Sequence, residues 1–208
     1  MTREAAWLEW ARGLAAIAQN GLLYAGDVFD AARYRQVGGI AAAMLAAGGA
    51  GPEPDVLAVL GREEGYATPK VDVRAYVTRG DRVLLVRELA DGRWALPGGW
   101  ADPGDAPSSA AQREVAEEAG YRVRATRLLA CWDRSLMPDA EPYPFRVYKL
   151  FFACEVLGEV PRDESENDAV EWHPLDALPP LSLGRVDATQ IARLRQLAQD
   201  PAAPAAFD

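Results

Sequence analysis

Residues 99–121, with the sequence GWADPGDAPSSAAQREVAEEAGY, decide the fold. A glycine-containing loop leads into a segment in which Pro107 suits the first turn of a helix and Gly120 ends it. One arginine and three glutamates stand on this helix: Arg113, Glu114, Glu117 and Glu118. Residues three and four apart lie on the same face of a helix, so we expect the three carboxylates to converge on one small volume.

Carboxylates gathered in this way repel one another unless a cation offsets their charge. Mg²⁺ prefers oxygen ligands and typically binds through a few carboxylates, waters and substrate phosphates. Arg113 lies four residues before Glu117 and can pair with it, while the other carboxylates face the metal. Gly98 and Gly99 permit close backbone approaches that a side chain would block. The alternative is a solvated acidic face, which is the usual role of a glutamate-rich helix.

The whole pattern resembles the signature of the Nudix family, Gly-x5-Glu-x7-Arg-Glu-U-x-Glu-Glu-x-Gly-U, in which U is an apolar residue. The matching positions are Gly99, Arg113, Glu114, Val115, Glu117, Glu118, Gly120 and Tyr121. A chance match of so many fixed positions is improbable, so we favour the catalytic interpretation over the solvated face. Asp105 departs from the pattern, because the family has glutamate there. We interpret Asp105 as a supporting residue of the loop, or only as a cap of the helix.

The Nudix resemblance covers about residues 70–180 and implies an α/β fold, an α/β/α sandwich around a mixed sheet. It implies that Mg²⁺ or Mn²⁺ binds at four positions: Gly99, Glu114, Glu117 and Glu118. The same glutamates and Arg113 would then be catalytic. The implied reaction is the hydrolysis of a nucleoside diphosphate linked to another group, which gives a nucleoside monophosphate and a phosphorylated product. A divalent metal ion would assist this hydrolysis, because the ion offsets charge on the phosphate oxygens and lowers the pKa of a bound water.

Residues 7–37, WLEWARGLAAIAQNGLLYAGDVFDAARYRQV, resemble a bacterial Nudix subgroup that carries a helical N-terminal domain. The subgroup acts on X-linked nucleoside diphosphates and includes dimeric CDP-choline pyrophosphatases. The resemblance implies a homodimer and favours CDP-choline or a related CDP-alcohol as substrate, with ADP-ribose or a nucleotide sugar as the alternative. A Nudix-fold nucleotide sensor without catalysis is a further hypothesis. The intact glutamate pairs argue against it, because a pure binder needs no carboxylate cluster.

Helical spacing of apolar residues predicts a small all-helical domain at residues 1–66, ahead of a Nudix domain at residues 67–208. The first helix is expected to end near Asn20-Gly21 and to bury one face: Trp7, Trp10, Leu14, Ile17 and Ala18. Asp27 is placed to cap a second helix that ends at Gly48-Gly49, and residues 56–60 suit a third. An apolar face with two tryptophans would be a liability on a monomer, so we expect packing or dimerisation there.

Alternating apolar residues predict the strands of the Nudix domain. We expect a hairpin that turns at Gly80-Asp81, formed by residues 71–77 and 83–86. Further strands are expected at residues 94–96, 123–133, 146–156 and 169–173. The expected helices are residues 107–119 and 187–199. Residues 201–208, rich in alanine and proline, are expected to fray.

Further candidate site residues stand outside the signature or at its start. Glu166, in an acidic loop, is our choice for a catalytic base or an extra metal ligand, because several Nudix pyrophosphatases carry a glutamate there. A solvated acidic loop is the alternative. Arg87, together with Gly98 and Gly99, is a candidate for binding a substrate phosphate. A surface ion pair is the alternative for Arg87.

The composition limits the partners. A formal net charge of −9 disfavours nucleic acid, whose binders usually carry a basic patch, so a small nucleotide is the expected partner. No run approaches the roughly 18 apolar residues of a membrane span, and the N-terminus lacks a signal-peptide pattern. We therefore expect a cytoplasmic protein without a membrane partner. Cys131, Cys154 and His173 are too few for a zinc site, so we expect free buried thiols.

Overall fold

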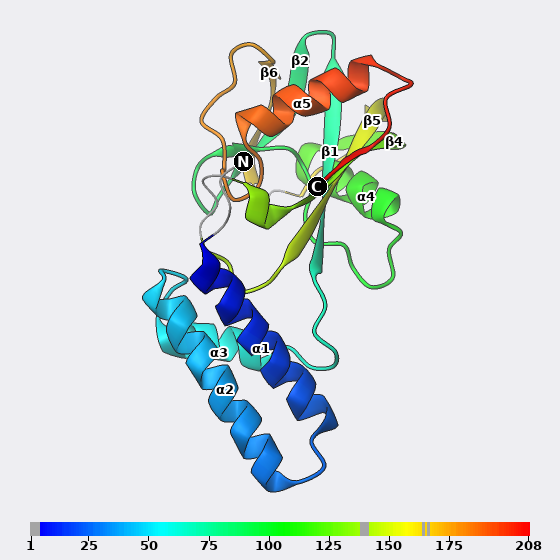
Figure 1. Cartoon of the computed structure of the whole chain (residues 1–208). Coiled ribbons are helices and arrows are strands. Elements are labelled where there is room, and N and C mark those ends of the chain that lie inside the picture. The colour runs from blue at the N-terminus through cyan, green and yellow to red at the C-terminus, as the bar shows by residue number, and fades with distance from the viewer. Residues whose placement is uncertain (1–4, 138–141, 164, 166) are drawn as a thin grey trace. The chain divides into compact units, whose positions relative to one another are not determined.

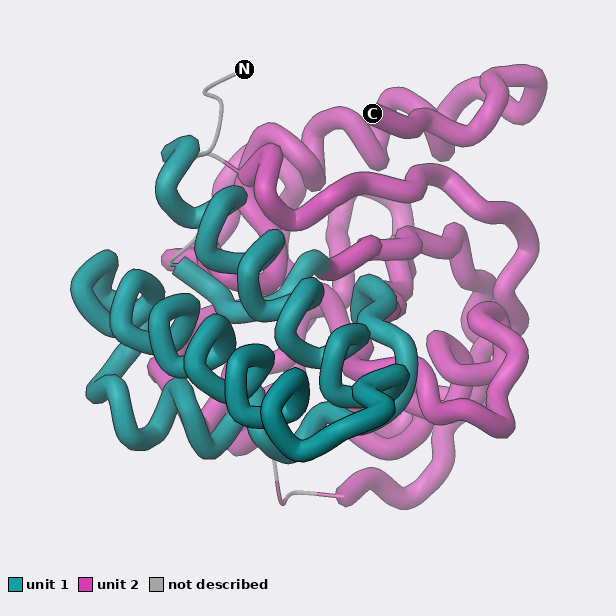
Figure 2. The backbone as a smooth tube through the Cα atoms, turned by 60° about the horizontal axis from the view of Figure 1, so that its bottom comes forward, with its two compact units in different colours: residues 1–70, 138–146 teal, residues 71–137, 147–208 magenta. Residues whose placement is uncertain are grey.

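The computed structural model describes residues 5–137, 142–163, 165 and 167–208. The chain divides into two compact units (Figure 2), which are residues 1–70 with 138–146, and residues 71–137 with 147–208. The first unit is mainly helical and the second contains most of the sheet. Within the described ranges, no helix is long and apolar enough to cross a membrane.

Three helices form the first unit (Figure 1): α1 (Ala6–Tyr24), α2 (Val28–Ala47) and α3 (Glu53–Gly61). The carboxylate of Asp27 accepts hydrogen bonds from the backbone N–H groups of Phe29 and Asp30, which confirms the predicted cap of α2. The predicted end of α1 at Asn20-Gly21 is wrong. Asn20 instead accepts a hydrogen bond from the N–H of Ala67 at 2.7 Å. Gly21 gives room to α2, since a Cβ there would lie 2.2 Å from the ring of Tyr34.

The predicted buried face of α1 is also partly wrong. Trp10 and Ile17 are 64% and 56% exposed. The buried residues of the two long helices are mostly small: Leu8, Ala11, Ala18, Ala41, Ala42 and Leu45. Small side chains let the helix axes approach closely, which leaves the larger apolar residues outside the contact. Trp7 does pack on this core, over Gly48, where a Cβ would lie 1.9 Å from the indole.

The sheet has the strand order β3-β2-β1-β5-β4-β7, and β6 pairs with β2 off this path. Its strands are β1 (Lys70–Arg79), β2 (Arg82–Glu88), β3 (Trp94–Ala95), β4 (Tyr121–Asp133), β5 (Val147–Glu159), β6 (Asn167–Pro174) and β7 (Ala206–Phe207). The predicted hairpin is present, because β1 and β2 are antiparallel and Gly80 turns the chain with φ 61°. The β4–β7 pair is parallel, so the sheet is mixed.

Helices cover both faces of this sheet (Figure 1): α4 (Pro107–Ala119) on one and α5 (Ala188–Gln199) on the other. Along β2 the buried side chains alternate, as successive residues of a strand must. Val83 and Leu85 belong to the core under α5, whereas Leu84 and Val86 belong to the core under α4. The predicted α/β/α sandwich around a mixed sheet, preceded by a helical region, is confirmed.

The fraying predicted for residues 201–208 is wrong. Ala206 and Phe207 pair in parallel with Ala130 and Cys131 of β4. The carboxylate of Asp208 accepts a hydrogen bond from the N–H of Asp133 at 2.8 Å. A partner far away in the sequence therefore orders this end, and an alanine- and proline-rich composition gives no sign of it.

Candidate active site

The signature helix α4 begins at Pro107 and ends before Gly120, whose φ of 69° is left-handed. Its apolar side packs on the sheet through Ala110, Ala111, Val115 and Ala119. The same packing draws two of the three glutamates inward. Glu114 and Glu118 are 8% and 6% exposed, whereas the side chain of Glu117 is 51% exposed. The helix thus presents two nearly buried carboxylates beside one that reaches solvent.

The loop before α4 passes close to β1 at two glycines. A Cβ on Gly98, whose φ is 143°, would lie 2.1 Å from the carbonyl oxygen of Val73. The N–H of Gly98 donates to Glu118 Oε2 at 2.7 Å. The carbonyl of Gly99 accepts from the N–H of Val73 at 2.8 Å, and a Cβ on Gly99 would lie 3.0 Å from Glu114 Oε2. Only residues without a side chain fit between the strand and the carboxylates here.

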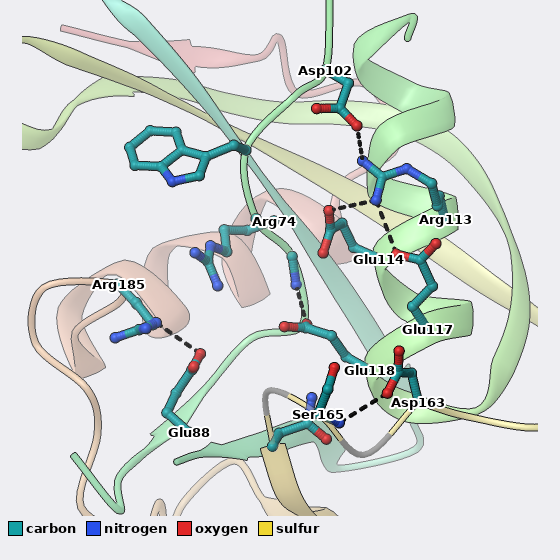
Figure 3. A pocket seen from close by; sticks show the side chains of 14 residues that line it. Arg74, Glu88, Asp102, Arg113, Glu114, Glu117, Glu118, Asp163, Ser165 and Arg185 are labelled. Atoms are coloured by element: carbon teal, nitrogen blue, oxygen red, sulfur yellow. Dashed lines mark hydrogen bonds and ion pairs between the residues drawn. The ribbon is translucent and has the colours of Figure 1, made fainter. Parts of the chain in front are cut away.

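Arg113 connects the carboxylates of the site (Figure 3). Its Nη1 lies 2.9 Å from both Glu114 Oε1 and Glu117 Oε2, so the predicted pairing with Glu117 is present and extends to Glu114. Its Nε donates to Asp105 Oδ2 at 3.1 Å. The interpretation of Asp105 as a helix cap is wrong, because Ala106 is the N-cap and no side chain caps α4. Asp105 instead supports the guanidinium from the loop.

Burial perturbs both inner carboxyl groups. Removal from water raises the pKa of Glu118 to about 8, although the nearby Arg74 and the Gly98 N–H favour its charged form. Removal from water also raises the pKa of Glu114, against the effect of Arg113. Carboxyl groups that resist ionisation in a cleft are typical of functional sites. A cation placed between them would favour the charged forms.

The acidic face lines a pocket of about 350 Å³. Its lining residues are Arg74, Glu88, Gly98, Gly99, Trp100, Asp102, Arg113, Glu114, Glu117, Glu118, Asp163, Ser165, Asn167 and Arg185. Gly98, Gly99 and the four charged residues of the signature are thus brought together.

Arg74 and Arg185 lie across the pocket from α4 (Figure 3). Buried Arg74 donates to Asp72 Oδ1 at 2.9 Å and to the carbonyl of Leu96 at 3.1 Å. Arg185 Nε lies 2.8 Å from Glu88 Oε1. Sequence reasoning missed both arginines. Charged residues inside the apolar run of β1 are a signal that could have indicated Arg74, whereas no local pattern marks Arg185.

Two predicted site residues, Arg87 and Glu166, are not among the described residues that line this pocket. Arg87 does not line it among the described residues, and its Nε and Nη2 donate to the carboxylate of Asp168 at 2.8 and 2.9 Å. Both side chains are more than 40% exposed, so the surface ion pair accounts for Arg87. Glu166 lies outside the described residues. Its neighbours Ser165 and Asn167 line the pocket.

The donor set fits a hard divalent cation. Carboxylate and backbone carbonyl oxygens are ligands that Mg²⁺ and Mn²⁺ prefer, and Gly99, Glu114, Glu117 and Glu118 offer both kinds. Within the described ranges, no group of three or more histidine, cysteine, aspartate or glutamate side chains is arranged so that it could hold a metal ion without rearrangement. The guanidinium of Arg113 is the positive charge between Glu114 and Glu117 here. The buried carboxyl groups with raised pKa are those that a cation would stabilise most.

Comparisons with known proteins agree with this geometry. Residues 68–194 match the family model described as NUDIX domain. Residues 5–60 match the model described as UDP-X-like, N-terminal oligomerisation domain, which supports an oligomer. YjhB of Bacillus subtilis (strain 168), which carries the provisional name ADP-ribose pyrophosphatase, is 37% identical over 202 residues and 97% of either chain.

Two similar structures extend the comparison. An ADP-ribose pyrophosphatase from Streptococcus suis 89-1591 is 38% identical with a TM-score of 0.60, over 68% of this chain and 100% of its own. A UDP-X diphosphatase is 28% identical with a TM-score of 0.63, over the full length of both chains. The chain belongs to the Nudix family and is a pyrophosphatase-type hydrolase with an N-terminal oligomerisation domain.

Proposed function

We propose that this Nudix pyrophosphohydrolase cleaves a nucleoside diphosphate linked to a sugar, such as ADP-ribose or a nucleotide sugar. The products are a nucleoside monophosphate and a sugar phosphate. Two of the relatives above are named for ADP-ribose and one for UDP-X. These names support the alternative substrate class over CDP-choline, which none of the three mentions.

The observation that carries the proposal is a pocket with carboxylates on one side and arginines on the other. Nudix enzymes generally use divalent metals, and Gly99, Glu114, Glu117 and Glu118 would hold Mg²⁺ or Mn²⁺ here. When bound, the cation offsets the charge of the diphosphate and makes water more acidic. Arg74 and Arg185 would bind phosphate oxygens through charge-assisted hydrogen bonds.

The surrounding residues keep this arrangement in place. The N–H of Gly98 orients Glu118 through Oε2. Arg113 orients Glu114 and Glu117, and Asp105 supports Arg113 from the loop. Side chains held in this way lose little freedom when a substrate binds, which favours catalysis. Glu166 stays our proposed base, since its described neighbours Ser165 and Asn167 line the pocket.

We further propose that residues 1–66 form the association domain of a homodimer and that residues 67–208 carry the chemistry. Support comes from the oligomerisation domain matched at residues 5–60. It also comes from exposed apolar side chains on the helices, such as Phe29 at 72% and Tyr24 at 73%. Such side chains in number mark interaction surfaces. Light scattering of the purified chain would show twice the chain mass, and a monomer at micromolar concentration would refute this.

A substrate panel tests the function. Initial rates are measured for ADP-ribose, UDP-sugars, CDP-choline and nucleoside triphosphates, with Mg²⁺ and Mn²⁺ in parallel and with EDTA as the blank. We expect a sugar-linked diphosphate to give the highest kcat/KM, only with metal. Glu117→Gln should lower kcat by about 100-fold or more, because it removes a charged ligand. A preference for CDP-choline would refute the substrate class. Turnover in EDTA, or unaltered rates in Glu117→Gln and Glu118→Gln, would refute the mechanism.

A further inference from the structure

Asn167 is the unusual residue of the pocket. It begins β6, lines the pocket and is 0% exposed. Within the described part of the chain, neither its Nδ2 nor its Oδ1 has a hydrogen-bond partner. A primary amide can donate two hydrogen bonds and accept others. Leaving such a group buried and unpaired is costly, so its presence at a pocket needs a reason.

A β-bulge places Asn167 in the pocket. In the register of β2 and β6, Arg87 pairs with Ala169 and Glu88 with Asn167, so that Asp168 is skipped. Bulges re-aim side chains and are common next to active sites. Asp168 turns to solvent and binds Arg87, whereas its neighbour Asn167 is fully buried. The bulge therefore lets the adjacent residues Asp168 and Asn167 face solvent and the pocket, respectively.

A positioned guanidinium belongs to the same end of the pocket. Glu88, which pairs with Asn167 across the strands, lies 2.8 Å from Arg185 Nε through its Oε1. Arg185 Nη1 donates to Ser182 Oγ at 3.2 Å, and Ser182 donates to Asp91 at 2.8 Å. The guanidinium has further N–H donors for a ligand. None of these residues belongs to α4, so this polar end is separate from the acidic face.

We propose that Asn167 is a specificity-determining residue that hydrogen-bonds the sugar attached to the diphosphate, while Arg185 binds a neighbouring phosphate oxygen. This rests on the proposed function and names the part of the substrate that is recognised. A sugar hydroxyl both donates and accepts hydrogen bonds, as the amide does. The trimethylammonium end of choline has no N–H or O–H donor, so it would leave Oδ1 unpaired. A site built around a buried polar group rejects a ligand that cannot pair with it.

The test compares wild type with Asn167→Leu, which keeps a similar side-chain size and removes both polar atoms. Loss of these hydrogen bonds should raise KM for ADP-ribose roughly tenfold and leave KM for CDP-choline nearly unaltered. The melting temperature should stay equal or rise, because an unpaired buried amide is replaced by an apolar group. Asp168→Asn, the outward neighbour, is the matched control and should leave both KM values as in wild type.

Binding of α,β-methylene ADP-ribose, whose carbon bridge resists hydrolysis, separates this inference from the proposed function. Calorimetry should give a Kd roughly tenfold higher for Asn167→Leu than for wild type. A roughly tenfold higher Kd in Asn167→Leu, combined with no hydrolysis of ADP-ribose by wild type, would support the sugar contact of Asn167 and refute the proposed hydrolase function. Hydrolysis with equal KM and Kd in both proteins would refute the subsite alone. An equal loss for ADP-ribose and CDP-choline would also refute it, because the contact would then be to the ribose or diphosphate that both substrates share.

Discussion

The apparent affinity for Mn²⁺ is expected to rise about 50-fold from pH 6 to pH 8. A carboxyl group must lose its proton to bind a cation, and burial raises the pKa of Glu118 to about 8. With that pKa, about 1% of these groups are ionised at pH 6 and about half at pH 8. The apparent affinity follows the ionised fraction, so it increases with pH and levels off above pH 8.

The assay is a Mn²⁺ titration of the full chain without substrate, in which the electron paramagnetic resonance signal reports free Mn²⁺ at several pH values. Glu118→Gln is the matched variant, because an amide does not titrate in this range and its oxygen can still accept the Gly98 N–H. This variant should bind Mn²⁺ more weakly, with a shallower dependence that comes from Glu114, whose pKa is also raised. A flat profile in wild type, or the full slope retained in Glu118→Gln, would refute the reasoning.

Three further predictions concern single substitutions. Without metal, wild type should lose stability as pH rises from about 4.5 to about 8, because the folded state keeps a proton on Glu118 that the unfolded chain releases. Glu118→Gln should remove most of that loss, with a remainder from Glu114, and should be more stable than wild type by a few kcal/mol at about pH 8 in calorimetry. Equal pH profiles of stability in the two proteins would contradict this prediction. Gly98→Ala should cost about 2 kcal/mol or more in urea unfolding, because its Cβ would lie 2.1 Å from the Val73 oxygen. In Gly104→Ala, a control in the same loop, the new Cβ meets nothing within 4 Å, so the free energy of unfolding should change little. Equal losses of stability in the two variants would contradict the close approach of Gly98 to Val73. Arg113→Lys should lower kcat roughly tenfold, because a single ammonium cannot bind three carboxylates at once. Arg87→Gln, outside the pocket, should keep wild-type kinetics. A larger loss of kcat in Arg87→Gln than in Arg113→Lys would show that Arg87 belongs to the active site.

The signature helix was predictable because its determinants are local. Pro107 favours the first turn, Gly120 supplies a left-handed end, and the i, i+4 spacing brings Arg113 to Glu117. Alternation of apolar residues likewise predicted the hairpin of β1 and β2. Such signals act over a few residues, so a sequence carries them without knowledge of the tertiary fold.

Features that depend on distant partners were missed or wrong. Asn20-Gly21 has the composition of a helix end, yet Gly21 serves to admit Tyr34 of the neighbouring helix. The composition of the C-terminal residues predicts an unstructured end, but Ala206 and Phe207 pair with β4. Asn167 and Arg185 reach the pocket only because a bulge and a loop bring them there. None of these arrangements has a period or a motif that a single sequence could reveal.

The central claim is that the carboxylates of α4 hold a divalent ion. A crystal grown with Mn²⁺ and measured at the manganese absorption edge tests it most directly. We predict an anomalous peak at about 2.1 Å from carboxylate oxygens of Glu114 and Glu118 and near the Gly99 carbonyl. A saturated crystal without a peak at this face would contradict the account.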